Sequence, residues 1–267
     1  VIASWPAAVV QGQSGTKGGE WPTYGGDLGH TRYAPLDQID ATNFGRLELA
    51  WRFKTDNLGP RPEFTLQSTP LVVNGRLYST AGTRRAVVSL DAATGEQKWV
   101  YSLDEGARGA AAPRQLSGRG LSYWTDGKED RILYVTPGYQ LVALDARTGR
   151  PVPGFGQDGI VDLKQNNDQV LDPITGEIGL NTGPIVAKDV VIVGAAHRAG
   201  GAAGDDLQGL GLRRYAFAGA DVLQTLDDRP HLDRGKVEPL AARQDGNWNL
   251  VRLGRAEDEF HMLRRLF

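Results

Sequence analysis

The stretch Leu90-Asp91-Ala92-Ala93-Thr94-Gly95 occurs a second time as Leu144-Asp145-Ala146-Arg147-Thr148-Gly149, 54 positions later. An apolar run precedes each copy, Val87-Val88-Ser89 in the first and Leu141-Val142-Ala143 in the second. A short apolar run followed by an acidic residue and a glycine is typical of a strand that ends in a turn. The repetition predicts a strand-and-turn unit that is used more than once along the chain.

Hairpin patterns lie upstream of both copies. Residues 69–78 contain Asn74-Gly75 between two alternating runs, and residues 122–135 contain Asp126-Gly127 in the corresponding place. A third hairpin pattern spans residues 184–193, with its turn 114 positions after Asn74-Gly75. Such dipeptides between alternating runs predict tight β-hairpins.

The repeating unit therefore has four short strands, a period of about 50 residues and no helical pattern, which is typical of a propeller blade. Trp51 and Trp99, 48 positions apart, fit the same period. We predict an all-β fold, a partial β-propeller of about two and a half to three blades. Because a propeller closes with about four to eight blades, this number of blades indicates part of a longer protein.

The two ends of the chain lack the repeat. Residues 1–19 begin with an apolar stretch, which we interpret either as the remainder of a secretory signal peptide or as a terminal strand. We assign residues 20–202 to the blades and residues 203–267 to an irregular tail that does not match them. β-Branched residues nearly vanish from this tail. It is either an out-of-frame or unrelated extension, which we favour, or a genuine C-terminal segment that packs poorly.

Composition excludes several functions. The chain has 267 residues, no cysteine, and 30 basic against 32 acidic side chains. Without cysteine there is no disulfide, thiolate metal site or cysteine nucleophile. The charge balance provides no basic field for nucleic acid, and no apolar run reaches the roughly 18 residues of a transmembrane span. We therefore expect neither a nucleic-acid partner nor a transmembrane span.

Short stretches in a fixed order connect the repeats with a known family. Besides the two Leu-Asp-Ala-x-Thr-Gly copies they are Glu20-Trp21-Pro22-Thr23-Tyr24-Gly25-Gly26-Asp27, Arg32-Tyr33-Ala34-Pro35-Leu36, Leu49-Ala50-Trp51, Gln67-Ser68-Thr69-Pro70-Leu71-Val72-Val73 and Arg119-Gly120-Leu121-Ser122-Tyr123-Trp124. Over about residues 20–201 they resemble the N-terminal blades of the dehydrogenases that depend on pyrroloquinoline quinone (PQQ). Gly154-Phe155-Gly156 and residues 159–163 are most similar to the branch that oxidises glucose, other sugars and polyols.

The resemblance implies an eight-bladed propeller with the quinone near its axis, a calcium ion beside the quinone and a carboxylate base opposite. The reaction would be oxidation of a sugar or alcohol by hydride transfer to the quinone, with a membrane quinone or a cytochrome as electron acceptor and a periplasmic location. The family's calcium ligands and catalytic base lie mainly in later blades. We therefore assign no catalytic residue, leave the metal ligands open, and expect this chain to be inactive by itself.

Six residues match positions that contact the cofactor in the family. Arg119 matches an arginine, which would pair with the anionic quinone; the alternative is a surface arginine that closes a blade turn. Gln67 stands where many relatives have a glutamate, or else it faces water at the edge of a hairpin. The remaining matches are Asn181 and Thr182 before the third hairpin, and Ala196 and His197 in the loop after it. For His197 a plain loop side chain is the alternative.

Two further interpretations remain open at this stage. Asp168, Asp172 and Glu177 form a polar run that suggests calcium binding, but a solvated turn explains Asp172-Pro173-Ile174-Thr175-Gly176 more simply. The repeat is also compatible with a non-enzymatic propeller that serves as a scaffold for protein interactions. Arg119 and the stretch that follows it favour the enzyme, because a bare scaffold blade does not need them.

Overall fold

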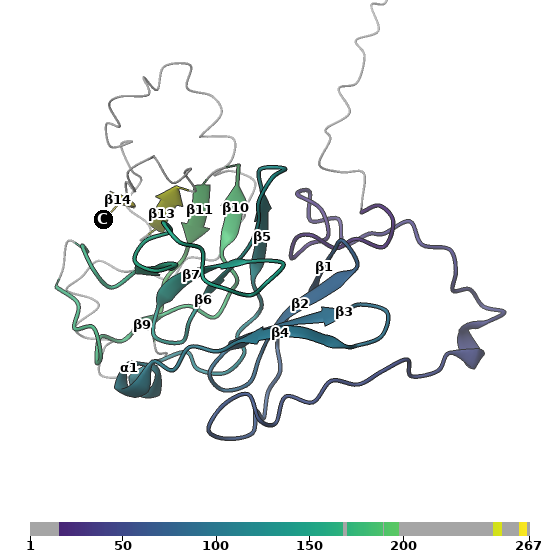
Figure 1. Cartoon of the computed structure of the whole chain (residues 1–267), viewed down its shortest axis with the longest axis horizontal. Coiled ribbons are helices and arrows are strands. Elements are labelled where there is room, and N and C mark those ends of the chain that lie inside the picture. The colour runs from purple at the N-terminus through teal and green to yellow at the C-terminus, as the bar shows by residue number, and fades with distance from the viewer. Residues whose placement is uncertain (1–15, 168–169, 189, 198–247, 253–261, 266–267) are drawn as a thin grey trace, which may run out of the picture.

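The computed structural model describes residues 16–167, 170–188, 190–197, 248–252 and 262–265. Predictions for residues 1–15 and for most of 203–267 lie outside the described residues. The described part contains three four-stranded antiparallel sheets, and in the first two each strand pairs with the next strand along the chain (Figure 1). This arrangement confirms the predicted all-β partial propeller, with each sheet as one blade.

The first two sheets are continuous meanders. The first comprises β1 (Leu71–Val73), β2 (Arg76–Ala81), β3 (Ala86–Asp91) and β4 (Gln97–Tyr101). The second comprises β5 (Ser122–Thr125), β6 (Asp130–Val135), β7 (Gln140–Asp145) and β8 (Ile160–Asp162). Asn74 and Gly75 have φ angles of 53° and 71°, so the predicted hairpin turn has the left-handed backbone that an Asn-Gly pair accommodates.

The third sheet combines two distant parts of the chain. It comprises β10 (Ile185–Ala187), β11 (Val190–Val193), β13 (Trp248–Arg252) and β14 (Met262–Arg265). We predicted an irregular tail, but within its described residues two strands extend this sheet, with Val191 opposite Val251. Backbone hydrogen bonds join strands whatever their side chains are, so the scarcity of β-branched residues did not prevent pairing. The reading-frame hypothesis stays a prediction.

The middle sheet is buried on both faces because successive side chains of a strand point in opposite directions. On β6, Ile132 and Tyr134 pack against the first sheet, whereas Leu133 and Val135 pack toward Ile178, Leu180 and the third sheet. On β7, Val142 and Leu144 likewise face the first sheet, and Leu141 and Ala143 face the third. The near-continuous apolar runs of these strands are explained by this two-sided burial.

Two tryptophans link a preceding part of the chain to the two repeated turns, one from the first sheet and one from the irregular segment before it. Trp99, on β4, donates from Nε1 to Ala146 O at 3.0 Å, and Trp51 donates to Ala92 O at 3.2 Å. A Cβ added to Gly149 would lie 2.5 Å from the ring of Trp99, and one added to Gly95 would lie 2.6 Å from the ring of Trp51. The glycine of each Asp-Ala-x-Thr-Gly turn is therefore required by the indole that covers it.

Regular structure outside the three sheets is sparse in the described part. It comprises the 3-10 helix η1 (Phe44–Arg46), the helix α1 (Gly106–Ala111) between β4 and β5, and the two-stranded ribbon of β9 (Ile178–Gly179) and β12 (Ala196–His197). Residues 27–66 run outside the sheets as a long, mainly irregular segment (Figure 1). Among the described residues, no helix has the length and apolar character needed to cross a membrane.

Candidate functional site

Three chain segments meet where the first strands of the three sheets begin. The amide of Thr69 donates to Arg119 O at 3.1 Å, and the amide of Arg119 donates to Asn181 O at 2.7 Å. Thr69 also pairs with Gly120 as an isolated parallel bridge. Each segment leads into a first strand, namely β1, β5 or β10, so equivalent positions of three successive blades form one continuous edge.

This edge lies on the side where the sheets converge. The first strands β5 and β10 lie side by side (Figure 1), and the Ser122 hydroxyl donates to Pro184 O between them. Blades of a propeller surround a central channel, and the strands that approach one another are the ones nearest to it. The segments before β1, β5 and β10 therefore lie on the inner side of this partial ring.

Four of the six predicted residues come together at this edge. Asn181 donates from Nδ2 to Gln67 Oε1 at 3.4 Å, although 114 positions separate them. The side chains of Gln67, Arg119 and Thr182 are exposed, and within the described part of the chain the Arg119 guanidinium has no hydrogen-bond partner. The edge thus presents an exposed cation beside two side-chain amides and a hydroxyl.

Two glycines shape the backbone around Arg119. Gly118 and Gly120 have φ angles of 66° and 132°, in the range that residues with a Cβ rarely adopt. A Cβ added to Gly120 would lie 3.0 Å from Thr69 O. The close approach of the first two blades therefore depends on glycine next to the candidate arginine.

The other two predicted residues lie on the neighbouring ribbon. Ala196 pairs with Gly179 and His197 pairs with Ile178, and β9 ends two residues before Asn181. The Tyr139 hydroxyl donates to Gly194 O at 3.1 Å, which attaches the loop before β12 to the second sheet. The backbone of Ala196 and His197 is thus connected to the candidate edge through β9.

Sequence reasoning missed a buried side chain that binds the backbone of the segments carrying the edge residues. Arg85 is 2% exposed, and its guanidinium donates to the carbonyls of residues 114, 116, 135 and 180. Burial lowers the pKa of Arg85 to about 10, opposed by the carboxylates of Glu105 and Glu63. The only signal in the sequence was a charged residue at the start of a buried strand, and Arg84 beside it carries the same side chain.

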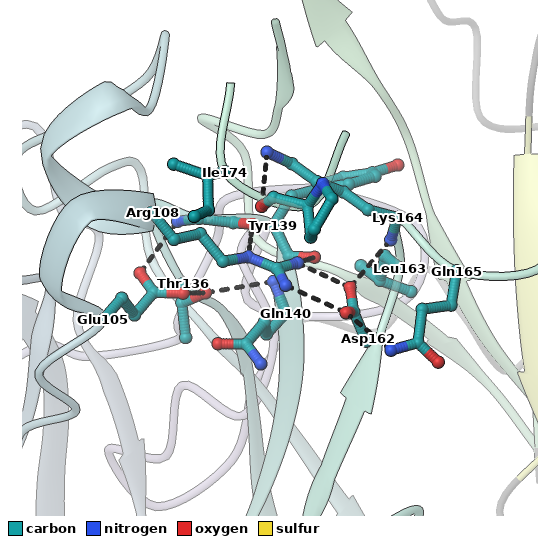
Figure 2. A network of polar contacts seen from close by, with 12 residues as sticks. Glu105, Arg108, Thr136, Tyr139, Gln140, Asp162, Leu163, Lys164, Gln165 and Ile174 are labelled. Carbon is teal, nitrogen blue, oxygen red and sulfur yellow. Dashed lines mark hydrogen bonds and ion pairs between the residues drawn. The ribbon is translucent and has the colours of Figure 1, made fainter. Parts of the chain in front are cut away.

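A second missed network fixes α1 against the middle sheet (Figure 2). Arg108 binds both oxygens of Asp162, from Nη1 at 2.9 Å and from Nη2 at 2.5 Å. Glu105 accepts hydrogen bonds from the Thr136 hydroxyl at 2.7 Å and from the amide of Gly138 at 2.8 Å. Although burial acts to raise it, the pKa of Asp162 is lowered by its hydrogen bonds and its ion pair with Arg108. The network fixes the connection that leads from β4 to Arg119.

Within the described ranges, no three His, Cys, Asp or Glu side chains gather in a way that could hold a metal ion. Asp172 accepts from the amides of Ile174 and Thr175 at 2.8 and 2.6 Å, and the amide of Gly176 donates to Asp172 O at 3.1 Å. Asp145 and Gly149 form the same kind of turn. Residues 172–176 thus form a turn like the repeated ones, as the solvated-turn interpretation expects, while Asp168 lies outside the described residues and the calcium alternative stays a prediction.

Comparisons with known proteins agree with this architecture. A family profile described as "PQQ: Glucose/ethanol/alcohol dehydrogenase, beta-propeller domain" matches residues 21–209. The first two sheets, the strands β10 and β11 of the third, and the edge at the first strands lie within this range. The chain belongs to the family of PQQ-dependent dehydrogenase propellers.

Individual relatives give the same result. The chain is 30% identical over 199 residues to the glycerol dehydrogenase large subunit of Gluconobacter oxydans (strain 621H), which covers 70% of this chain and 26% of the relative. It is 38% identical over 149 residues to the dehydrogenase subunit of a quinone alcohol dehydrogenase from the same organism, covering 54% of this chain and 18% of the relative. The crystal structure of quinohemoprotein alcohol dehydrogenase from Comamonas testosteroni matches with a TM-score of 0.51 at 26% identity, over 67% of this chain and 23% of that one. The chain spans about a quarter of the length of these relatives or less.

Proposed function

We propose that this chain is the N-terminal part of a PQQ-dependent dehydrogenase that oxidises a sugar or an alcohol, and that the edge at Gln67, Arg119 and Asn181 is one wall of its quinone site. The observation that carries the proposal is the meeting of these residues from three successive blades, with the Arg119 guanidinium exposed beside two amides. The family and the relatives named above support the reaction class.

The side chains at the edge suit an anionic, flat ligand. A guanidinium binds a carboxylate through two parallel hydrogen bonds, and the amides of Gln67 and Asn181 provide both donors and acceptors. When bound, the quinone would supply the two-electron acceptor for the hydride of the substrate. The residues of this chain would bind and orient it.

We further propose that the isolated chain does not turn over substrate. None of the residues at the edge is a carboxylate that would take the proton of the substrate hydroxyl, and calcium ligands would come from later blades. Large apolar side chains such as Leu49, Phe64 and Leu66 are more than half exposed, which supports additional blades as their cover. Electron transfer to a membrane quinone or a cytochrome, in the periplasm, belongs to the same proposal.

Titration with PQQ, with and without calcium, tests the cofactor wall. We expect weak, saturable binding to the chain that Arg119→Ala lowers at least tenfold, followed by quinone absorbance and by the shift in Tm. Arg147→Ala is the matched control, because Arg147 is an exposed arginine on the repeated turn of the same blade. Equal affinity of the two variants would contradict the role of Arg119. Absence of saturable binding to the wild-type chain would favour the scaffold function instead.

Activity is tested separately, by dye-linked oxidation of glucose and of primary alcohols. We expect no turnover by the purified 267-residue chain even at saturating PQQ and calcium. Robust oxidation would show that the isolated chain is sufficient for catalysis. It would contradict our assignment of the catalytic base and the metal ligands to later blades.

A further inference from the structure

Arg85 is a buried cation whose partners are all backbone carbonyls. Four of its five N–H donors are used: Nε donates to Leu116 O at 3.0 Å, Nη2 to Arg114 O at 2.8 Å, and Nη1 to Val135 O at 2.9 Å and Leu180 O at 2.7 Å. No carboxylate binds it among the described residues. A buried charge normally requires extensive hydrogen bonding, and these four bonds hold the side chain in one position.

Two of the four acceptors of Arg85 lie just before candidate site residues. Leu116 precedes Arg119 by three positions, and Leu180 directly precedes Asn181. Arg85 itself belongs to the first blade, since it lies between β2 and β3 and directly precedes Ala86, the first residue of β3. One side chain of the first blade therefore binds the segments that lead into the first strands of the second and third blades.

The segment before Arg119 has a backbone that needs such support. Leu116 has a φ of 70°, a left-handed conformation that is costly for a residue with a branched side chain. A Cβ added to Gly118 would lie 2.9 Å from Arg85 Nε and 3.2 Å from Asn181 O. The guanidinium thus fills the space under residues 116–118 and leaves no room for an alternative path of the chain.

Glu63 holds the same segment through a different group. Its Oε1 accepts from the amide of Ser117 at 2.8 Å and its Oε2 accepts from the amide of Gly82 at 2.9 Å. Residues 114–117 are therefore bound through carbonyls by Arg85 and through an amide by Glu63. Arg85 belongs to the first blade and Glu63 to the irregular segment before it, so the conformation around Arg119 depends on the part of the chain that precedes β3.

We propose that Arg85 is a positioning residue for the quinone wall: by binding the carbonyls of Leu116 and Leu180 it fixes Arg119 and Asn181 relative to each other before a ligand arrives. The inference rests on the proposed function for the identity of the ligand, but the positioning of the edge is measurable without one. Preorganisation of this kind lowers the cost of binding, because the ligand need not order the wall.

Hydrogen exchange of the full chain separates positioning from general stability. The probes are the amides of Thr69 and Arg119, which form the hydrogen bonds between the blades, and the amides of β6 serve as the reference. With Arg85→Met we expect exchange at the two probes to accelerate at least tenfold more than exchange in β6. Arg85→Lys keeps the charge with fewer and differently directed donors. For this variant we expect an intermediate acceleration of exchange that is still confined to the two probes. It replaces Arg85→Met as the test if the Met variant does not fold.

Two controls are available in the chain. Arg84→Met removes an adjacent arginine whose guanidinium forms an exposed ion pair with Asp104 at 2.6 Å, and it should leave the probes unchanged. Val142→Ala removes buried apolar volume from the middle sheet, and it should accelerate exchange throughout in proportion to lost stability. If the Arg85 variants give the uniform pattern of Val142→Ala, Arg85 is only a structural residue and the proposal is wrong.

Quinone titration of the same four variants gives the functional readout. We expect both Arg85 variants to weaken PQQ binding at least tenfold at a temperature where they are folded, and both controls to bind as the wild type does. Unchanged affinity in a folded Arg85 variant would overturn the positioning role. A wild-type chain without saturable binding would count against the proposed function, whereas the exchange pattern would still decide whether Arg85 positions the edge.

Discussion

The second sheet and residues 27–66 carry similar apolar side chains in opposite surroundings. Leu133, Leu141 and Leu144 are fully buried between two neighbouring sheets, whereas Leu28, Leu49 and Phe64 are at least 70% exposed. The sequence of a blade provides two apolar faces but covers neither of them. Whether an apolar side chain is buried in this fold therefore depends on the segments that lie beside it, and the described residues do not cover Leu28, Leu49 or Phe64.

The largest expected effect comes from the tryptophans that pack on the two repeated turns. Trp99→Ala should lower the free energy of unfolding by about 3–5 kcal/mol, because the buried indole packs on Gly149 and donates to Ala146 O. Trp51→Ala, at the incompletely covered end, should cost clearly less. Chemical denaturation of both variants provides the comparison. Equal losses of unfolding free energy would show that the two indoles stabilise the protein to the same extent.

Truncation of aliphatic side chains sharpens the same contrast. Leu144→Ala, in the core between the first two sheets, should destabilise the protein by about 2–5 kcal/mol. Leu49→Ala should remain within about 0.5 kcal/mol of the wild type, as is usual for exposed positions. Urea unfolding measures both. A large loss in Leu49→Ala would reveal that residues 27–66 are buried in solution, for example by self-association.

A smaller effect is expected for the ion pair that attaches α1 to the middle sheet. Asp162→Asn should cost about 1.5–3 kcal/mol near neutral pH, because it removes charged hydrogen bonds to Arg108. The folded pKa of Asp162 lies below its ordinary value, so the carboxylate stabilises the fold above the unfolded pKa and this contribution is lost as the pH falls through the folded pKa.

Unfolding measured from pH 7 down to pH 3 checks this prediction. The difference between the wild type and Asp162→Asn should narrow below about pH 4. Asp37→Asn is the control, since Asp37 is exposed on the irregular segment. A difference that does not change with pH would show that the lost stability comes from packing and not from the charge.

The smallest change in stability is expected where the apolar surface is exposed. The double variant Leu49→Ser and Phe64→Ser should leave Tm nearly unchanged but reduce self-association, because large exposed apolar patches drive aggregation. Sedimentation velocity at increasing concentration measures the effect. Faster association of the variant than of the wild type would contradict the exposed position of this segment.

The repeated turns and hairpins of the fold could be predicted because they are local. Asn74-Gly75 and the two Asp-Ala-x-Thr-Gly turns determine their own backbone conformation within a few residues. For Trp51 and Trp99 the sequence showed only their regular spacing. Their packing partners could not be predicted, because the turns on which they pack lie 41 and 47 positions further along the chain. The strands β13 and β14 were missed because pairing with β11 has no signal in their side chains.

The exposed residues of the candidate edge could be predicted from the sequence, but the buried arginine that binds the backbone of the edge could not. Gln67, Arg119 and Asn181 stand in recognisable stretches, and the structure brings them together. Arg85 could not be distinguished from Arg84, because the direction of a side chain at the start of a strand depends on the register with neighbouring strands. The role of Arg85 depends on backbone carbonyls that are distant in the sequence. Every residue has such a carbonyl, so no sequence pattern indicates which ones a buried arginine will bind.

The linking tryptophans also set an order for the synthesis of the protein. Each indole leaves the ribosome before the turn on which it packs, and for Trp99 the partner at Ala146 follows 47 residues later. At about 5–20 residues per second this interval lasts roughly 2–9 s. Each of these two tryptophans therefore stays uncovered until its turn has emerged, and a nascent chain that pauses in this interval would be the form most in need of a chaperone.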